Sequence, residues 1–356
     1  MNKHLIALCA ATAAAMPAAA QQATSSVTLY GITDVAVTHI SNRGGASLNL
    51  LDSGRLQSSR FGFRGREDLG DGLTGLFTLE NGFALDTGAQ SSASTFWNRQ
   101  AFVGLGSASL GTLTLGIQYT PIYDQLILLS PNVTFGGHAG VVDGVAAPTS
   151  APGRYNNTLG GTRTANSVKY TSPSFGGFRV RAMVGLGEVA GSSSAGRQTS
   201  IALGYDQGPL SAGIGYLTAN CGGAGGCAAG QDRDKVLVAG AGYDFKVARV
   251  SAIVSHQENA RNVVGNEATS YSVLGTVPIG NWALSAGYSA MNDKAAQDWD
   301  LRQFNAGVQY YLSKRTTLYG FWSRQKVDNG GKAHMLMLES SDSRQDQYGI
   351  GLRHTF

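Results

Sequence analysis

The last twelve residues, QDQYGIGLRHTF (345–356), alternate between two kinds of side chain. One set of alternate positions holds Tyr348, Ile350, Leu352 and Phe356, and the other holds polar residues or glycine. Successive side chains of a strand point to opposite faces, so the segment predicts a β-strand with one apolar face. A chain that finishes on such a strand has to pair its edge with another segment.

The same alternation recurs along the chain. It is clear in VTLYGITDVAV (27–37), in RFGFRG (60–65) and in LRQFNAGVQYYL (301–312). Each segment predicts a strand with one apolar and one polar face. We predict sixteen strands, near residues 26–39, 58–66, 73–83, 96–106, 111–119, 165–171, 178–187, 197–205, 210–219, 235–243, 249–257, 269–277, 282–291, 301–311, 316–325 and 344–356.

The predicted connections alternate between short and long. The short ones, such as DLGD and SPSFGG, are rich in turn-forming residues. The long ones are polar stretches near 40–57, 84–95, 120–164, 188–196, 220–234, 258–268, 292–300 and 326–343. Bacterial membrane barrels have an even number of strands, short turns on one side and long loops on the other. The sequence therefore predicts an all-β fold, a transmembrane 16-stranded antiparallel β-barrel with a wet interior.

The first twenty residues, MNKHLIALCAATAAAMPAAA, predict a secretory signal peptide that is cleaved before Gln21. Lys3 supplies the basic start, an apolar run follows, and three alanines form the cleavage site. The alternative is a retained anchor, which the apolar run is too short to provide as a membrane-spanning helix. We expect residues 1–20 to be removed and residues 21–356 to form a single barrel domain.

Composition agrees with this fold. Glycine accounts for 49 of the 356 residues, about twice its usual share, and charged residues make up 14%, against about a quarter in typical globular proteins. The formal net charge is +4, which falls to +3 when Lys3 leaves with the signal. That balance, without any basic run, does not predict a nucleic-acid partner. No motif implies a cofactor.

Two of the three cysteines follow the signal, Cys221 and Cys227 in NCGGAGGCAAG. Because the cell envelope is oxidising, we predict that they form a disulfide that closes a small glycine-rich loop. A metal site is the alternative, but neither a histidine nor another cysteine lies nearby to complete one.

Five stretches spread over the mature chain carry a family resemblance: SSVTLYGITDVAV, SSRFGFRGREDLGDGL, NRQAFVGLGSASLGTLTLGIQYTP, NSVKYTSPSFGG and the terminal YGIGLRHTF. They resemble the general porins of Gram-negative bacteria, of the type found in β-proteobacteria. The resemblance implies a homotrimer of outer-membrane barrels, each a water-filled channel for ions and small hydrophilic solutes. It also implies that the terminal Phe356 is a signal for the outer-membrane assembly machinery.

The longest connection, 120–164, is the third long one. A connection of this length without a clear strand is usually functional. The stretch FGG at residues 135–137 resembles the tip of the porin loop that folds inward and narrows the channel. We therefore expect this connection to be the constriction loop.

Porins of this type place arginines on the wall opposite the constriction loop. Arg60 in SSRFGF, Arg99 in NRQAFVGL and Arg163 before NSVKY match those positions by local sequence. Arg64 shares the polar face of Arg60, one repeat further along its strand. We therefore predict that these four arginines line the constriction, the alternative for each being a solvated charge on a loop or rim.

Enteric porins carry a carboxylate just before the FGG-like stretch, but here the residue is Thr134. The carboxylates left in the loop are Asp124 and Asp143. Because a narrow pore focuses the field of its lining charges, an excess of arginine predicts that the channel prefers anions.

Three other functions remain open to test. A barrel enzyme is disfavoured, because G-x-S-x-G, H-E-x-x-H and P-loop motifs are all absent from the sequence. A substrate-specific anion channel would use the same arginines, since guanidinium groups pair well with phosphate and carboxylate. A receptor role for the outer loops has no positive signal.

Overall fold

The computed structural model describes residues 25–129, 163–223, 225–335 and 338–356. The predicted signal peptide, residues 1–20, lies outside these ranges. No helix in the described part of the chain is long and apolar enough to cross a membrane.

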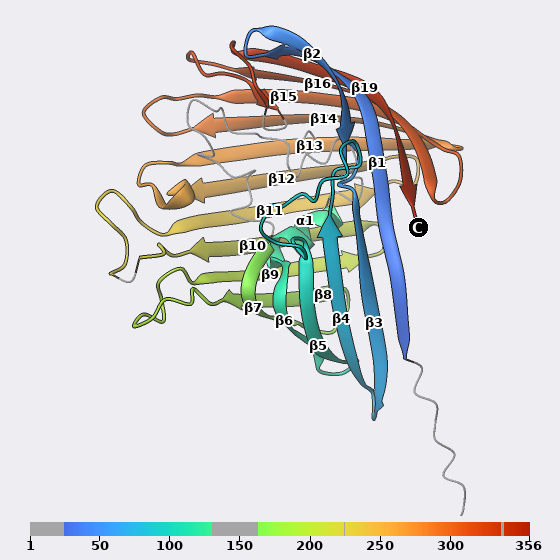
Figure 1. Cartoon of the computed structure of the whole chain (residues 1–356), viewed down its shortest axis with the longest axis vertical. Coiled ribbons are helices and arrows are strands. Elements are labelled where there is room, and N and C mark those ends of the chain that lie inside the picture. Colours follow the sequence, from blue (N-terminus) through green and yellow to red (C-terminus); the bar gives the residue numbers. More distant parts are fainter. Residues whose placement is uncertain (1–24, 130–162, 224, 336–337) are drawn as a thin grey trace, which may run out of the picture.

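One antiparallel sheet closes on itself as a barrel of sixteen strands, which confirms the predicted fold class (Figure 1). The barrel strands are β1 (Ser26–Arg43), β3 (Arg60–Gly70), β4 (Leu73–Gly82), β5 (Gln100–Ser107), β6 (Gly111–Tyr119), β7 (Arg163–Thr171), β8 (Phe178–Gly185), β9 (Gln198–Gln207), β10 (Leu210–Ala219), β11 (Asp234–Asp244), β12 (Arg249–Glu258), β13 (Ala268–Ile279), β14 (Trp282–Asp293), β15 (Leu301–Tyr311), β16 (Thr316–Val327) and β19 (Arg344–Thr355). The smaller elements are strands β2 (Ala46–Ser53), β17 (His334–Met335) and β18 (Leu338–Glu339), helix α1 (Pro121–Leu129) and a 3-10 turn at Ala260–Asn262.

The C-terminal strand closes the barrel against the first strand. β19 pairs with β1 in a register that places Thr355 beside Ile32. Beyond it, the N–H of Gly31 donates to the carbonyl of Phe356 at 3.0 Å, and the N–H of Phe356 donates back at 3.1 Å. The Phe356 ring covers Gly31, where an added Cβ would lie 2.2 Å from its Cζ. The last residue thus completes the ladder and removes the sheet edge.

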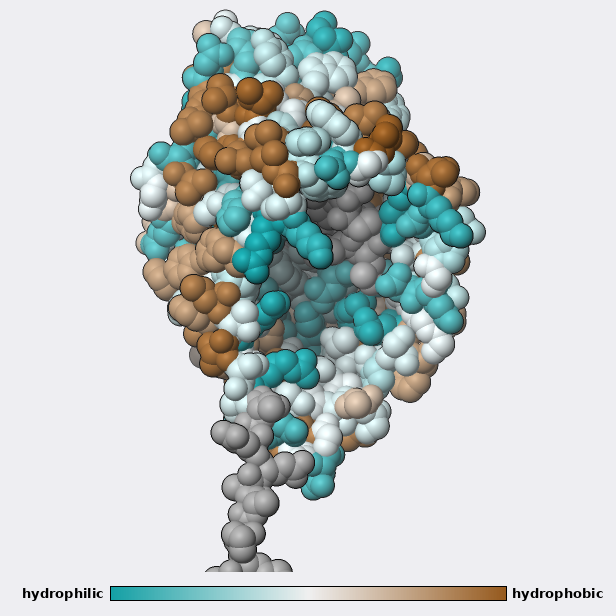
Figure 2. Space-filling view, turned by 90° about the vertical axis from the view of Figure 1, so that its right-hand side faces the viewer, coloured by the Kyte–Doolittle hydropathy of each residue, from teal (hydrophilic) through white to brown (hydrophobic). Residues whose placement is uncertain are grey.

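Alternation along the strands separates an apolar outer face from a polar inner face. On β19, Ile350 is 71% exposed and Leu352 43% exposed on the outside, whereas the inward Gln345 and Gln347 are buried. Figure 2 shows the molecule from the end at which β19 finishes. Hydrophilic residues line a hollow there, and hydrophobic residues lie on the outer sides of the molecule. This distribution suits a barrel surrounded by lipid and filled with water.

The first long connection differs from the prediction. Residues 40–57 do not form a simple polar loop, because β1 continues to Arg43 and β2 returns along it. The turn uses Gly44 and Gly45, whose φ values of 60° and 106° favour glycine. Two glycines between alternating segments predict a β-hairpin, which we did not predict from the sequence.

Between β2 and β3 the chain folds onto the inner wall. The carboxylate of Asp34 accepts hydrogen bonds from the N–H groups of Leu56 and Gln57 at 3.1 and 2.7 Å. Its other oxygen accepts one from the Tyr319 hydroxyl at 2.6 Å. Asp34 and Leu56 are almost fully buried. Asp34 therefore anchors an inserted segment and is not a free lumen charge.

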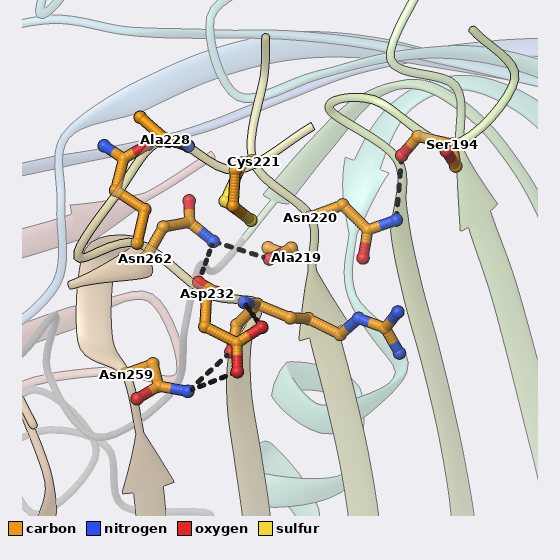
Figure 3. The surroundings of a disulfide bond; sticks show 11 residues. Ser194, Ala219, Asn220, Cys221, Ala228, Asp232, Asn259 and Asn262 are labelled. Carbon is orange, nitrogen blue, oxygen red and sulfur yellow. Dashed lines mark hydrogen bonds between the residues drawn. A yellow bond between two sulfur atoms is a disulfide. The ribbon is translucent and has the colours of Figure 1, made fainter. Parts of the chain in front are cut away.

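A disulfide joins Cys221 to Cys227 in the loop after β10 (Figure 3). Side-chain amides tie the same region together. Asn220 donates to the carbonyl of Ser194 at 2.8 Å, and Asn262 donates to the carbonyls of Ala219 and Asp232 at 2.8 and 3.0 Å. The loops on the outer side of β9 to β12 are thus joined to one another.

Candidate functional site

Two of the predicted arginines meet at one carboxylate on the inner wall. Arg60 begins β3, Glu80 lies near the end of β4, and Arg99 immediately precedes β5. The Nε atom of Arg99 lies 2.8 Å from Oε1 of Glu80, and the Nε atom of Arg60 lies 3.6 Å from Oε2. The Tyr30 hydroxyl donates to the same Oε2 at 3.0 Å. One carboxylate is therefore shared by two guanidinium groups.

The register of the sheet produces this arrangement. Gly62 lies between Tyr30 on β1 and Glu80 on β4, in line with both. An added Cβ at Gly62 would lie 2.9 Å from the Tyr30 hydroxyl oxygen and 2.5 Å from the carbonyl oxygen of Leu79. The absence of a side chain at Gly62 thus lets Tyr30 reach Glu80 across the intervening strand.

Tyrosines extend the cluster toward β7. Nη2 of Arg99 donates to the Tyr119 hydroxyl at 2.7 Å. Arg163 lies opposite Tyr119 in the sheet, and its Cζ is 5.0 Å from the centre of that ring. The Tyr119 ring also stacks on Tyr123 of α1, with centroids 4.6 Å apart. Tyr119 therefore contacts both arginines, Arg99 through its hydroxyl and Arg163 through its ring.

Helix α1 begins the predicted constriction loop and lies inside the barrel against β9 and β10 (Figure 1). Gly204 and Gly213 are direct neighbours across these strands. An added Cβ on either would come within 2.0 to 2.3 Å of the Gln125 side chain, and one on Gly215 would lie 2.9 Å from Ile122. The glycines thus form a notch that seats the helix on the wall. The rest of the predicted loop, residues 130–162, lies outside the described residues.

Asp124 of α1 faces a second pair of cations. Nζ of Lys169 lies 2.9 Å from its Oδ2, and Nε of Arg181 lies 3.9 Å from the same oxygen. Arg181 also donates to Gln125 at 3.2 Å. These contacts fix the helix electrostatically as well as sterically.

The structure brings Arg60, Arg99 and Arg163 into one region and places Arg64 nearby. The Cζ of Arg64 lies 5.2 Å from the Tyr30 ring centre, and its side chain is exposed. The side chain of Arg60 keeps 16% of its accessible surface and that of Arg99 keeps 9%. Exposure therefore increases from Arg99 to Arg60 to Arg64.

Two other residues that we predicted for the constriction are not described by the structure. Thr134 and Asp143 lie outside the described residues.

Glu80, Tyr119 and Arg181 were missed by the sequence reading. Glu80 and Arg181 lie on the polar faces of alternating strands, so their orientation could be predicted, but their partners depend on strand register. Tyr119 shares alternate positions with the outward Leu113 and Leu115, and the sheet register shifts next to it, so alternation alone does not predict its inward position.

The described charges of this cluster are unequal. Arg60, Arg99, Arg163, Lys169 and Arg181 supply five cations, whereas Glu80 and Asp124 supply two carboxylates. Among the residues that the structure describes, no three His, Cys, Asp or Glu side chains gather as a metal site. The arrangement can attract and orient anions.

Comparison with known proteins agrees with this architecture. Residues 7–330 match the family model described as Gram-negative porin. The chain is 32% identical to outer membrane porin protein 32 of Delftia acidovorans, over the full length of both, and 29% identical to an outer membrane porin protein of Bordetella pertussis, over 95% of this chain and 96% of the relative.

Solved structures show the same fold. A structure titled anion-selective porin from Comamonas acidovorans matches 93% of this chain and 100% of its own, with a TM-score of 0.76 and 28% identity. The OmpT protein of Vibrio cholerae matches 93% of this chain and 99% of its own, with a TM-score of 0.66 and 18% identity. This chain belongs to the Gram-negative porins and is an outer-membrane channel for passive diffusion.

Proposed function

We propose that the channel prefers anions and that the arginines predicted from the sequence create this preference. The observation that carries the proposal is the charge of the described cluster, in which five cations face two carboxylates. The relative titled anion-selective porin supports it. Thr134 and Asp143 belong to the proposed constriction by sequence alone.

The mechanism is electrostatic. A lumen bounded by a low-dielectric wall focuses the field of its fixed charges, which raises the local concentration of oppositely charged ions. Guanidinium groups remain protonated at any working pH, so the field is permanent. Arg99 is largely buried, but its charge acts over several ångströms and does not require contact with the ion. The exposed Arg64 would meet the ion directly.

We infer that the functional unit is a homotrimer that reaches the outer membrane through the barrel assembly machinery. The support for a trimer is the OmpT structure, which is titled as a trimer form. The support for machinery recognition is Phe356, which is 44% exposed on the outside of the closing strand. Cross-linking before denaturation tests the first point, and deletion of Phe356 tests the second.

Single-channel recording tests the proposed function. Purified protein in a planar bilayer with a KCl gradient should give stepwise currents whose reversal potential lies on the chloride side. A reversal potential on the potassium side would contradict the anion preference, and would assign the selectivity to carboxylates such as Asp124 or Asp143.

A mildly substrate-specific anion channel is the second candidate. A cavity of about 240 Å³ is lined by Arg99 and Arg163 together with hydroxyl and amide side chains, namely Ser91, Ser92, Thr95 and Asn98. Such a cavity has the volume and the donors for one small anion. A conductance that saturates with one anion and not with chloride would favour this candidate.

A further inference from the structure

An inward arginine lies at the barrel closure, apart from the arginine cluster on β3 to β8. Arg353 of β19 lies directly opposite Asp34 of β1 on one side and Thr317 of β16 on the other. It alternates with Leu352, which is exposed on the outside, so its own side chain faces inward. Because β1 pairs with both β19 and β3, Arg353 stands only two strands away from the arginine cluster.

The carboxylate opposite Arg353 is covered. We call residues 54–59, between β2 and β3, the insert. Both oxygens of the Asp34 carboxylate accept hydrogen bonds, one from two N–H groups of the insert and the other from the Tyr319 hydroxyl. Asp34 has no exposed surface. The insert thus separates this carboxylate from the water of the channel, whereas Arg353 is only half-buried.

Several contacts hold the insert on the inner wall. The Ser59 hydroxyl donates to the carbonyl of Asp34 at 3.1 Å and accepts a hydrogen bond from the N–H of the same residue at 3.1 Å. Arg55, which is almost fully buried, donates through Nη1 to Oε1 of Gln347 at 2.9 Å. The insert is therefore fixed to the inner faces of β1 and β19, and the backbone position of Gln57 is fixed with it.

Gln57 of the insert orients Arg353. Nη1 of Arg353 donates to Oε1 of Gln57 at 3.2 Å, and Nη2 donates to Oγ1 of Thr317 at 3.3 Å. Both acceptors are neutral, and Nε of Arg353 has no hydrogen-bond partner among the described residues. A guanidinium group has five N–H donors. Donors on Nη1 and Nη2 therefore remain for a further acceptor.

The cations of the arginine cluster are bonded differently. Two pairs of cations there each share one carboxylate, at Glu80 and at Asp124. A carboxylate at ion-pair distance offsets much of the field of a neighbouring cation. The hydrogen-bond acceptors of Arg353 carry no charge, and the carboxylate of Asp34 is covered by the insert. An ion in the lumen would therefore meet the charge of Arg353 with little offset at short range.

We propose that Arg353 contacts permeating anions and is a further determinant of ion selectivity, with Gln57 as the residue that positions it. The inference rests on the proposed anion preference and assigns part of it to the barrel closure. A small anion would accept hydrogen bonds from the remaining N–H groups of the guanidinium, which stays charged at any working pH. Anions would thus meet cations on two parts of the inner wall.

The test measures the chloride-to-potassium permeability ratio of the purified protein in a planar bilayer with a KCl gradient. Arg353→Gln removes the charge and keeps a hydrogen-bonding amide, and Arg353→Lys keeps the charge. The matched control is Arg302→Gln, which removes one arginine from the outward face of β15, where the side chain is 57% exposed. Stepwise currents verify that each variant has folded as a channel.

We expect Arg353→Gln to lower the ratio about fivefold at low salt, on the scale of one unit charge about 4 Å from an ion. Arg353→Lys and Arg302→Gln should keep a ratio close to that of the wild type. An unchanged ratio in Arg353→Gln would overturn the proposal. So would an equal fall in Arg302→Gln, because the effect would then not depend on a charge inside the channel.

A second variant decides the matter if substitutions in the closing strand prevent folding. Gln57→Leu lies outside the strands, removes the acceptor that orients Arg353 and changes no charge. It should lower the ratio about twofold, on the scale of a weak hydrogen bond. An unchanged ratio in this variant would overturn the proposal. A wild type that prefers potassium would instead contradict the proposed function, so the two failures can be distinguished.

Discussion

The two sides of the barrel interior carry different chemistry. The wall formed by β3 to β8 holds the arginines and Lys169, together with Glu80. The inner face of β13 to β16 is polar but almost uncharged: Asp293, which binds the loop after β14, is the only Asp, Glu, His, Lys or Arg on the inner face of these strands. Ser272 and Ser289 are hydrogen-bonded there at 2.9 Å, and Gln325 donates to Gln303 at 3.0 Å.

The difference separates two requirements of a water-filled channel. Both walls pair polar side chains with one another, although Arg163 Nε on one wall and Asn305 Nδ2 on the other have no hydrogen-bond partner among the described residues. Of these two walls, the arginine wall carries the larger net charge, so we expect it to set the ion preference. The neutral wall acts as a hydrogen-bonded boundary. Changes on the two sides should therefore affect different properties.

The largest effect is expected when the arginine wall loses its charge. The double substitution Arg60→Ala with Arg99→Ala should lower the chloride-to-potassium permeability ratio about tenfold, because each unit charge about 4 Å from an ion contributes about 1 kcal/mol even in bulk water. Glu80 would then stand without two of its partners and would attract cations. The reversal potential in a KCl gradient measures the ratio. An unchanged ratio in folded protein would show that other residues set it.

Removing a carboxylate from the arginine wall should increase the difference in net charge between the two walls. Glu80→Gln removes one of the two carboxylates and keeps side-chain oxygen and nitrogen atoms for Arg99 and Tyr30. The permeability ratio should rise toward chloride by about fivefold, on the same electrostatic scale. A fall in the ratio would mean that Glu80 holds the arginines in position more than it offsets their charge.

The notch beneath α1 gives a steric test. The pair Gly204→Ala and Gly213→Ala would place methyl groups against Gln125 and push the helix away from the wall. We expect a change in single-channel conductance and a loss of about 1 to 3 kcal/mol in stability, as overpacking usually costs. The control is Gly275→Ala, whose Cβ would meet nothing within 4 Å. If control and test behave alike, the glycines do not seat the helix.

The smallest effect is expected on the neutral wall. Ser289→Ala removes the hydrogen bond to Ser272 and should cost about 1 kcal/mol of stability. The permeability ratio should stay at the wild-type value, since no charge is altered. Thermal unfolding and reversal potential measure the two quantities. A changed chloride-to-potassium permeability ratio would contradict the assignment of ion preference to the arginine wall.

The alternation of side chains along each strand explains which site residues could be predicted from the sequence. Arg60 and Arg64 alternate with the outward Phe61 and Phe63, so their direction follows from period 2 alone. The C-terminal strand that closes the barrel could be predicted for the same reason. Arg99 and Arg163 required a family resemblance, because Arg99 precedes its strand and β7 is irregular at Asn166, whose φ is 51°.

Partnerships could not be predicted in this way. Glu80 meets Arg99 only because β4 and β5 pair in a register that no local pattern specifies. The seat of α1 depends on Gly204 and Gly213 becoming neighbours across a hairpin. In the outer loops, the tight turn at Gly44 and Gly45 was a local signal that the length of the connection hid.

The salt dependence of selectivity tests the central claim most directly. The reversal potential of the wild type should be measured at one fixed KCl ratio, first near 0.1 M and then near 1 M mean concentration. Screening lengths fall from about 10 Å to about 3 Å over this range, so a preference created by fixed wall charges should be strong for chloride at low salt and much weaker at high salt. A chloride preference that does not change with salt, or a potassium preference at low salt, would contradict the account.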